Sequence, residues 1–283
     1  MLFAEIYERG GNYDYAINEY TRGIKEYPDN QQLYYARGKT YYNTRQYQKA
    51  VDDFSTAISL VSEMMMDCYR LRGTAYFNLK YYDEALADFV YYLNIKPDDP
   101  LANYFAARIF YERLDLSKAL SHFNKTIEKV PNYFEAYAFR GDTYFGLGEY
   151  HAALGDFNIA ISINGKKSEL YNSRGRVYHE LENYEYALND YSRAILLDGG
   201  NSLYYYNRAL LYFEMGDNYN AFSDINKAIE LNPNDREYYV HRVDILLKLV
   251  ESERNDSVKL HYLEMGKEDI ENLKKKGKDN EGK

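Results

Sequence analysis

The 283-residue sequence has one cysteine, Cys68, no tryptophan and only five prolines. A single cysteine cannot form an internal disulfide or supply the thiolates of a zinc site. No apolar run approaches the roughly 20 residues that a membrane-spanning helix needs, and the start, MLFAEIYERGG, is too short and too acidic for a signal peptide. We therefore expect a cytoplasmic protein without a membrane partner, unless a missing N-terminal segment changes its destination.

The sequence also lacks an excess of positive charge. It has 35 lysines and arginines against 44 aspartates and glutamates, a formal net charge of −9. Nucleic-acid binders need positive charge to neutralise phosphates, so we expect no nucleic-acid partner. The C-terminal run KKKGKDNEGK is basic, and we interpret it as a frayed, solvated end rather than a nucleic-acid patch.

Catalytic and metal-binding motifs are missing as well. The five histidines are scattered, at His122, His151, His179, His241 and His261. None belongs to an HExxH motif, no glycine-rich phosphate loop is present, and Cys68 has no basic partner nearby in the sequence. We expect a protein that is not an enzyme, with no catalytic residue, no cofactor and no metal site.

Aromatic residues, in contrast, are abundant, with 35 tyrosines and 13 phenylalanines, and they belong to an internal repeat. One alanine recurs every 34 or 35 residues, at Ala16, Ala50, Ala85, Ala119, Ala153, Ala187 and Ala221. A small residue precedes most of them by twelve positions, at Gly38, Gly73, Ala107, Gly141, Gly175 and Ala209. Aromatic residues flank both positions at helical offsets of three and four, and turn sequences such as GLGEY separate the halves. Each unit therefore predicts a helix, a turn, a second helix and a break.

One unit shows the full pattern in Tyr34, Arg37, Gly38 and Tyr41, followed by Ala50, Phe54 and Ala57. This spacing resembles the tetratricopeptide repeat (TPR) family, whose period is 34 residues. The resemblance implies an all-α solenoid of helix-turn-helix repeats that forms a right-handed superhelix. We place the repeat domain at residues 1–273 and a charged tail at 274–283. The repeats begin near residues 1 (truncated), 31, 66, 100, 134, 168, 202 and 236, and the last is a degenerate cap with an insertion of about 11 residues.

The repeats of this chain carry a charge pattern of their own. An arginine precedes the small residue, and an aspartate follows 16 positions later. The arginines are Arg37, Arg72, Arg140, Arg174, Arg208 and Arg242, and the aspartates are Asp53, Asp88, Asp156, Asp190 and Asp224. Repeat four has Ala106 and His122 instead, so both charges vanish together. We interpret the pattern as a bridge between the two helices of a repeat, with an arginine ladder for an acidic ligand as the alternative.

The family resemblance also implies a concave groove lined by the first helices, chiefly at their second, fifth, ninth, twelfth and thirteenth positions. The twelfth positions form an aromatic row interrupted once by histidine, and the fifth and ninth add basic residues. The candidate partner-binding residues are Lys39, Tyr42, Arg70, Phe77, Arg108, Tyr111, Phe145, Arg176, His179 and Phe213. Acidic residues such as Glu180 and Glu214 lie later in the chain, so the groove is expected to be polarised. The alternative is that the aromatic row is core or spacer.

These features predict a non-catalytic scaffold that binds a protein or peptide segment in the groove. A regulatory or sensor arm of a longer enzyme or signalling protein is the alternative. A carboxylate clamp for chaperone C-termini is not expected, because Glu237 lies where that clamp has a lysine. Weak self-association through the N-terminal repeat is a further expectation, since the apolar side of Leu2, Phe3 and Ile6 has no preceding repeat to cover it. Fraying of this short helix is the competing expectation.

Overall fold

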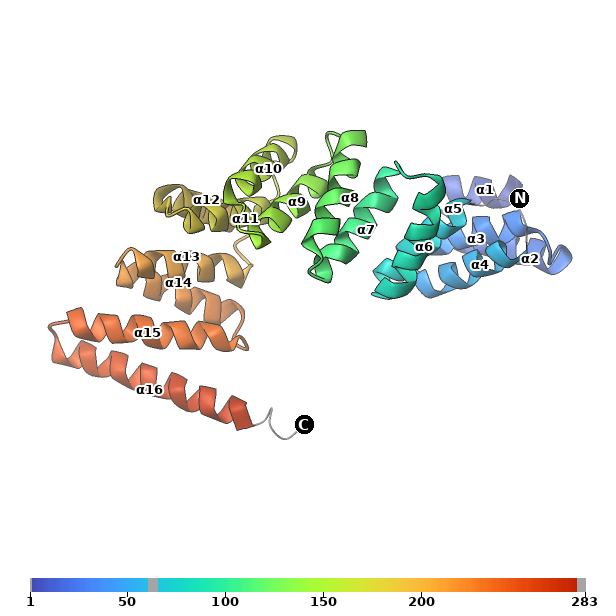
Figure 1. Ribbon diagram of the computed structural model, residues 1–283. Helices are drawn as coiled ribbons and strands as arrows, with labels where there is room; N and C mark the ends of the chain where they lie inside the picture. Colours follow the sequence, from blue (N-terminus) through green and yellow to red (C-terminus); the bar gives the residue numbers. More distant parts are fainter. Residues whose placement is uncertain (1, 61–65, 279–283) are drawn as a thin grey trace. The chain divides into compact units, whose positions relative to one another are not determined.

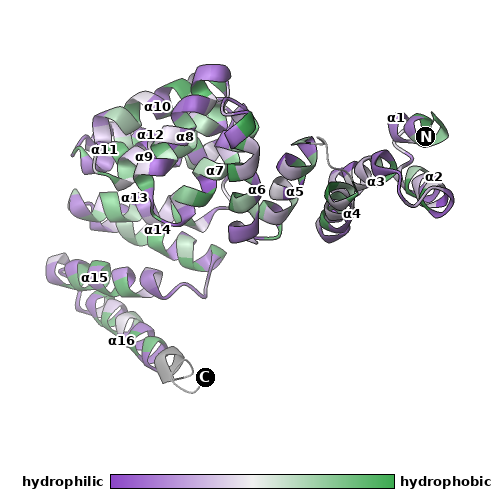
Figure 2. Ribbon diagram, turned by 45° about the vertical axis from the view of Figure 1, so that its right-hand side comes forward, coloured by the Kyte–Doolittle hydropathy of each residue, from purple (hydrophilic) through white to green (hydrophobic). Residues whose placement is uncertain are grey.

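The computed structural model describes residues 2–60 and 66–278, with side chains as far as residue 274. Within this part of the chain the secondary structure consists of sixteen α-helices and no strand (Figure 1). Apolar and polar residues both occur along the helices (Figure 2), as expected for helices that bury one side. The predicted all-α class is confirmed.

The chain divides into two compact units, residues 1–143 and 144–283. The described part of the first unit contains α1 (Leu2–Arg9), α2 (Tyr13–Glu26), α3 (Gln31–Asn43), α4 (Tyr47–Ser59), α5 (Met66–Asn78), α6 (Tyr82–Ile95), α7 (Pro100–Glu112), α8 (Leu116–Lys129) and most of α9 (Phe134–Gly146). The described part of the second unit contains the end of α9, then α10 (Tyr150–Ile163), α11 (Ser168–Glu180), α12 (Tyr184–Leu197), α13 (Ser202–Glu214), α14 (Asn218–Leu231), α15 (Arg236–Ser252) and α16 (Asp256–Lys278).

Within each unit the helices stack in chain order. From α1 to α8 in the first unit, and from α10 to α16 in the second, each helix packs against the next. The first helices of neighbouring pairs also touch, as α3 and α5 or α11 and α13 do. First helices therefore form one layer and second helices the other, which is the arrangement of an α-solenoid.

The turn inside a helix pair contains one residue with a left-handed backbone. Such residues recur at Gly11, Arg45, Lys80, Leu114, Gly148, Glu182 and Gly216. In the pair α3–α4, the Arg45 N–H donates to the Tyr42 carbonyl at 3.0 Å, and the next N–H, of Gln46, donates to the Tyr41 carbonyl at 2.8 Å. These bonds satisfy carbonyls that the end of α3 leaves open, and they reverse the chain into the second helix.

The two helices of a pair cross closely at the repeated small residue. A Cβ atom on Gly38 would lie 2.9 Å from the Phe54 ring, and one on Gly175 would lie 2.8 Å from the Tyr191 ring. The repeated alanines, such as Ala50 and Ala187, are fully buried on the facing helices. Glycine is needed here because a large aromatic side chain of the second helix packs directly on its backbone.

The last repeat accommodates its extra residues by lengthening its helices. α15 has 17 residues and α16 has 23, against 13 or 14 in the other complete pairs. α16 continues to Lys278, so residues 274–278 of the expected tail are helical, and 279–283 lie outside the described residues. Among the described helices, none combines the length and the apolar character needed to cross a membrane.

Candidate partner-binding surface

Most of the repeated arginines are engaged within the fold. Arg37 on α3 donates from Nε and Nη2 to the two carboxylate oxygens of Asp53 on α4, at 2.8 and 2.7 Å. The same two-bond pairing joins Arg72 to Asp88, Arg174 to Asp190 and Arg208 to Asp224. These four pairs confirm the predicted bridge between the helices of a repeat. Arg140 and Asp156 belong to different units, and their pairing stays a prediction.

A third hydrogen bond ties these arginines to the preceding repeat. Nη1 of Arg37 donates to Thr21 Oγ1 on α2 at 2.9 Å. The equivalent acceptors are Ser55 for Arg72, Asn124 for Arg140, Asn158 for Arg174, Ser192 for Arg208 and Asn226 for Arg242. This contact was not predicted, although the recurrence of Thr, Ser or Asn at one position of the second helix signals it.

Tyrosine rings flank the same guanidinium groups. The Arg37 Cζ atom lies 5.9 Å from the Tyr34 ring centroid and 5.7 Å from that of Tyr41. Burial raises the pKa of the Asp53 carboxyl, and hydrogen bonds from Arg37 act against that rise. Three of the five N–H donors of Arg37 are thus engaged in the fold, and its side chain is largely buried. This engagement favours the bridge over the ligand ladder for the four paired arginines.

The last repeat keeps the bridge with a different partner. Arg242 on α15 donates from Nε to Asp269 Oδ2 on α16 at 2.8 Å, and from Nη2 to Oδ1 at 2.5 Å. The two residues are 27 positions apart, against 16 in the other repeats. The difference of 11 equals the length of the insertion read from the sequence. Asp269 was missed because the insertion moves it away from the regular spacing.

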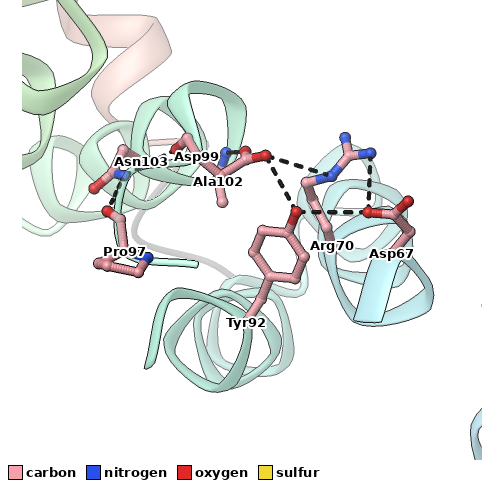
Figure 3. A network of polar contacts seen from close by, with 7 residues as sticks. All are labelled: Asp67, Arg70, Tyr92, Pro97, Asp99, Ala102 and Asn103. Atoms are coloured by element: carbon pink, nitrogen blue, oxygen red, sulfur yellow. Dashed lines mark hydrogen bonds and ion pairs between the residues drawn. The ribbon is translucent and has the colours of Figure 1, made fainter. Parts of the chain in front are cut away.

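Repeat four replaces the bridge by a neutral contact. His122 Nδ1 on α8 lies 2.8 Å from Asn103 Oδ1 on α7. The Asn103 amide group donates to the Pro97 carbonyl (Figure 3) and to the Asp99 carbonyl, each at 2.9 Å, so Oδ1 accepts a hydrogen bond from the Nδ1–H group of His122. Burial lowers the pKa of His122, and Lys125 adds a smaller contribution. The imidazole is thus held in its neutral form.

Figure 3 shows the junction between repeats three and four, where Tyr92 occupies the position that other repeats give to a small residue. Its hydroxyl donates to Asp99 Oδ2 at 3.1 Å and lies 3.5 Å from Asp67 Oδ1. Arg70, a candidate binding residue, lies between the same carboxylates, with Nη2 3.6 Å from Asp67 and Nε 4.0 Å from Asp99. Both carboxylates offset the positive charge of Arg70.

The other candidates of the first unit lie on its first helices. Lys39 is exposed, with Nζ 5.4 Å from the Tyr35 ring centroid. It lines a hollow of about 410 Å³ together with Glu5, Glu8, Arg9, Tyr20, Gln32, Tyr35 and Ala36. The ring of Tyr42 meets Tyr47 edge-on, with centroids 5.6 Å apart.

Phe77 and Tyr111 each contact an aromatic ring of the following repeat. The Phe77 ring centroid lies 5.0 Å from that of Phe105, and Tyr111 meets Phe139 edge-on at 6.0 Å. Arg108 contacts one ring of each pair, with its Cζ atom 5.4 Å from the Phe77 centroid and 3.8 Å from that of Phe139. Phe139 was missed as a site residue, since its contact depends on how α7 and α9 stack.

The second unit repeats this combination of ring and cation. Arg176 is exposed, and its Cζ atom lies 4.4 Å from the Phe145 ring centroid. His179 Nε2 lies 2.9 Å from Glu214 Oε2, so this interruption of the aromatic row is paired with an acid of the next repeat. Phe213 packs partly buried against the core around α13 and α14. The residues of the aromatic row are all half-buried, so each contributes both to packing and to the surface.

Within the described residues, no group of three or more histidine, cysteine, aspartate or glutamate side chains is placed to hold a metal ion. Cys68 is buried, and burial raises the pKa of its thiol to about 12, with a smaller contribution from Asp67. A thiol with so high a pKa is a poor nucleophile near neutral pH.

Family models of known protein repeats match most of the chain. Models of the tetratricopeptide repeat match residues 1–64, 70–134 and 104–169, and also 202–235, while a TPR repeat model matches 175–216. The chain therefore belongs to the tetratricopeptide repeat family, as its spacing predicts. Repeats of this family generally mediate protein–protein interactions, and proteins built from them are typically non-catalytic scaffolds.

Solved structures share the fold. The C-terminal part of a TPR repeat-containing protein from Cytophaga hutchinsonii is 17% identical, with a TM-score of 0.64, over 83% of this chain and 96% of that chain. A thermophilic TPR protein of Thermus thermophilus is 26% identical, with a TM-score of 0.52, over 64% and 99%. A chain of the APC/C hetero-tetramer Cut9–Hcn1 is 14% identical, with a TM-score of 0.64, over 82% and 46%. No curated protein matches this chain.

Proposed function

We propose that this chain is a non-catalytic scaffold that binds a segment of a partner protein on the faces formed by its first helices. The observation that carries the proposal is the pairing of a half-buried ring with a cation of the next repeat, Phe77 with Arg108 and Phe145 with Arg176. Aromatic and arginine side chains contribute most of the binding energy in protein interfaces. The paired arginines of the repeats, in contrast, already use all three guanidinium nitrogens within the fold.

The family and the related assemblies support this proposal. A chain of the hetero-tetramer Cut9–Hcn1, which shares the fold, is part of a protein complex. In the first unit, Lys39 and Arg108 make no ion pair with an acidic side chain among the described residues. Such cations favour acidic groups on the partner segment. We place the protein in the cytoplasm and assign it no nucleic-acid partner.

Affinity capture with the intact protein, followed by mass spectrometry, tests the proposal. The test variant replaces Lys39, Arg70 and Arg108 by alanine. A control replaces three exposed cations, Arg22, Lys118 and Lys248, which removes the same charge elsewhere. We expect the test variant alone to lose the partner and to flatten the dependence of capture on salt, because charges that touch the partner are screened by ions. Equal capture by both variants would place the interface elsewhere.

A further inference from the structure

Arg108 on α7 differs from the repeated arginines because aromatic rings hold it in place of a carboxylate. Its Cζ atom lies 3.8 Å from the ring centroid of Phe139, 5.4 Å from that of Phe77 and 5.9 Å from that of Tyr104. The three rings belong to α9, α5 and α7, which are all first helices, and all lie in the first unit. Within the described part of the chain, no acidic side chain forms an ion pair with Arg108.

Among the described residues, Arg108 uses one of its five N–H donors. Nη1 donates to Tyr104 Oη at 3.2 Å, and this is its one hydrogen bond to the described residues. Nε is buried and has no acceptor within the described part of the chain. Arg37, by comparison, uses Nε, Nη1 and Nη2 together. A charged donor without an acceptor in a poorly solvated position is unfavourable, so an incoming acceptor gains more here than at a solvated lysine.

Tyr104 supplies a second donor at the same place. Its side chain is 5% exposed, and its hydroxyl oxygen accepts the bond from Arg108. The hydroxyl proton has no acceptor among the described residues. Burial raises the pKa of Tyr104, so this proton stays in place at neutral pH. Arg108 and Tyr104 thus offer one cationic and one neutral donor to a single acceptor group.

We infer that Arg108 and Tyr104 bind the side-chain carboxylate of an aspartate or glutamate in the partner segment. This inference rests on the proposed function and names the chemistry of its anchor. The planar guanidinium, oriented by Phe139 and Phe77, matches the two oxygens of a carboxylate.

The charges around Arg108 favour a carboxylate over a phosphate. A phosphate group carries nearly two negative charges and is held best by more than one cation. Arg70, the neighbouring candidate cation, is already offset by Asp67 and Asp99. Burial raises the pKa of the Tyr104 hydroxyl, and the nearby negative charge of Glu135 raises it further. One unbalanced cation beside a glutamate suits a singly charged ligand.

A double-mutant cycle tests this inference. Peptides are selected from a random dodecamer library on the full chain, and the acidic residue of the tightest binder is changed to its amide. We expect this peptide change to weaken binding to the wild-type chain about tenfold, as for a charge-assisted pair. In Arg108→Gln the same change should have less than about a twofold effect, because the coupled partner is gone. Tyr104→Phe, which keeps the ring, should weaken acid-dependent binding because it removes the hydroxyl donor.

The controls separate this inference from the proposed function. Arg113→Gln removes an exposed arginine near the end of the same helix and should leave the peptide effect at full size. Replacing the acid by phosphoserine should weaken binding. Equal effects of the peptide change in wild-type and Arg108→Gln chains, or tighter binding of the phosphopeptide, would overturn the carboxylate site. Selected peptides without any acid that still require Phe77 would overturn it and leave the proposed function intact, whereas peptides that require neither Phe77 nor Arg108 would overturn both.

Discussion

Arginine occupies two chemical settings in this chain. In the repeats it joins an aspartate of the same repeat to a Ser, Thr or Asn of the preceding one, as Arg174 joins Asp190 to Asn158. Arg108 instead lies against aromatic rings, and its Nε has no acceptor in the part of the chain that the structure describes. Charge alone does not distinguish the two settings, but a matched aspartate does, 16 residues later in four repeats and 27 residues later in the last. The first setting joins the helices of the stack, and we propose the second as a contact for a partner.

The repeated bridge makes a prediction about stability. Arg174→Gln leaves the Asp190 carboxylate, which is 4% exposed, without its partner. We expect the free energy of unfolding in urea to fall by about 3 to 5 kcal/mol, because an unpaired charge is then buried. The matched control is Arg113→Gln, which breaks a pair with the 90% exposed Asp83 and should cost less than about 1 kcal/mol. Similar losses in the two variants would show that the bridge is no more than a surface pair.

The neutral contact in repeat four predicts a dependence on pH. The pKa of His122 is lowered in the folded chain, chiefly by burial, against about 6.5 for an unfolded histidine. Its contribution to stability is therefore fully present above about pH 6.5 and is lost as the pH falls through the lower folded pKa, because the unfolded chain binds the proton first. Urea titrations of the wild-type chain and of His122→Gln between about pH 5 and 8 measure the effect. The wild-type chain should lose more stability than the variant, and parallel curves would contradict this account.

At the scale of the helical element, two helical glycines have opposite roles. A Cβ atom on Gly175 of α11 would lie 2.8 Å from the Tyr191 ring, whereas a Cβ atom on Gly155 of α10 would meet nothing within 4 Å. We expect Gly175→Ala to destabilise the chain by about 1 to 3 kcal/mol through overpacking. Gly155→Ala should stabilise it by about 0.5 to 1 kcal/mol, since alanine favours the helix. Thermal unfolding of both variants tests the pair, and destabilisation by Gly155→Ala would contradict the packing described.

The helices were predictable because the residues that end them recur in most repeats. Pro28, Pro97, Pro131 and Pro233 lie between repeats, and a fixed turn with one left-handed residue separates the helices of a pair. The four observed arginine bridges followed from matched spacing in the same way. Repetition makes each local signal appear several times, so a single irregular unit does not hide it.

The candidate surface was less predictable, because its contacts join side chains from different repeats. Spacing places Phe77 and Arg108 on first helices, but the approach of Arg108 to the rings of Phe77 and Phe139 depends on how α5, α7 and α9 pack. The offset of Arg70 by Asp99 likewise depends on where the chain before α7 passes. The pairing of Asp269 with Arg242 was not predicted for a different reason: an insertion shifts Asp269 out of the regular repeat spacing.

At the scale of the whole molecule, the exposed side of α1 bears on self-association. Leu2, Phe3 and Ile6 are 69%, 65% and 54% exposed. We expect weak contact between copies through this apolar side, with an apparent mass that rises with concentration in sedimentation. Leu2→Glu with Phe3→Glu should abolish that rise, because a charge on the contact must be desolvated. A wild-type chain that stays monomeric over a hundredfold concentration range would remove this expectation.

The most direct test of the central proposal is a titration of the captured partner segment against two variants of the full chain. One variant replaces Phe77, Tyr111 and Phe145 on the first helices by alanine, and the other replaces Tyr186, Leu196 and Tyr219, which are exposed on the second helices. Both remove three large side chains, and circular dichroism confirms that each remains helical. The account predicts that affinity falls at least about tenfold in the first variant and stays within about twofold of the wild-type value in the second. A loss of affinity confined to the second variant would contradict it.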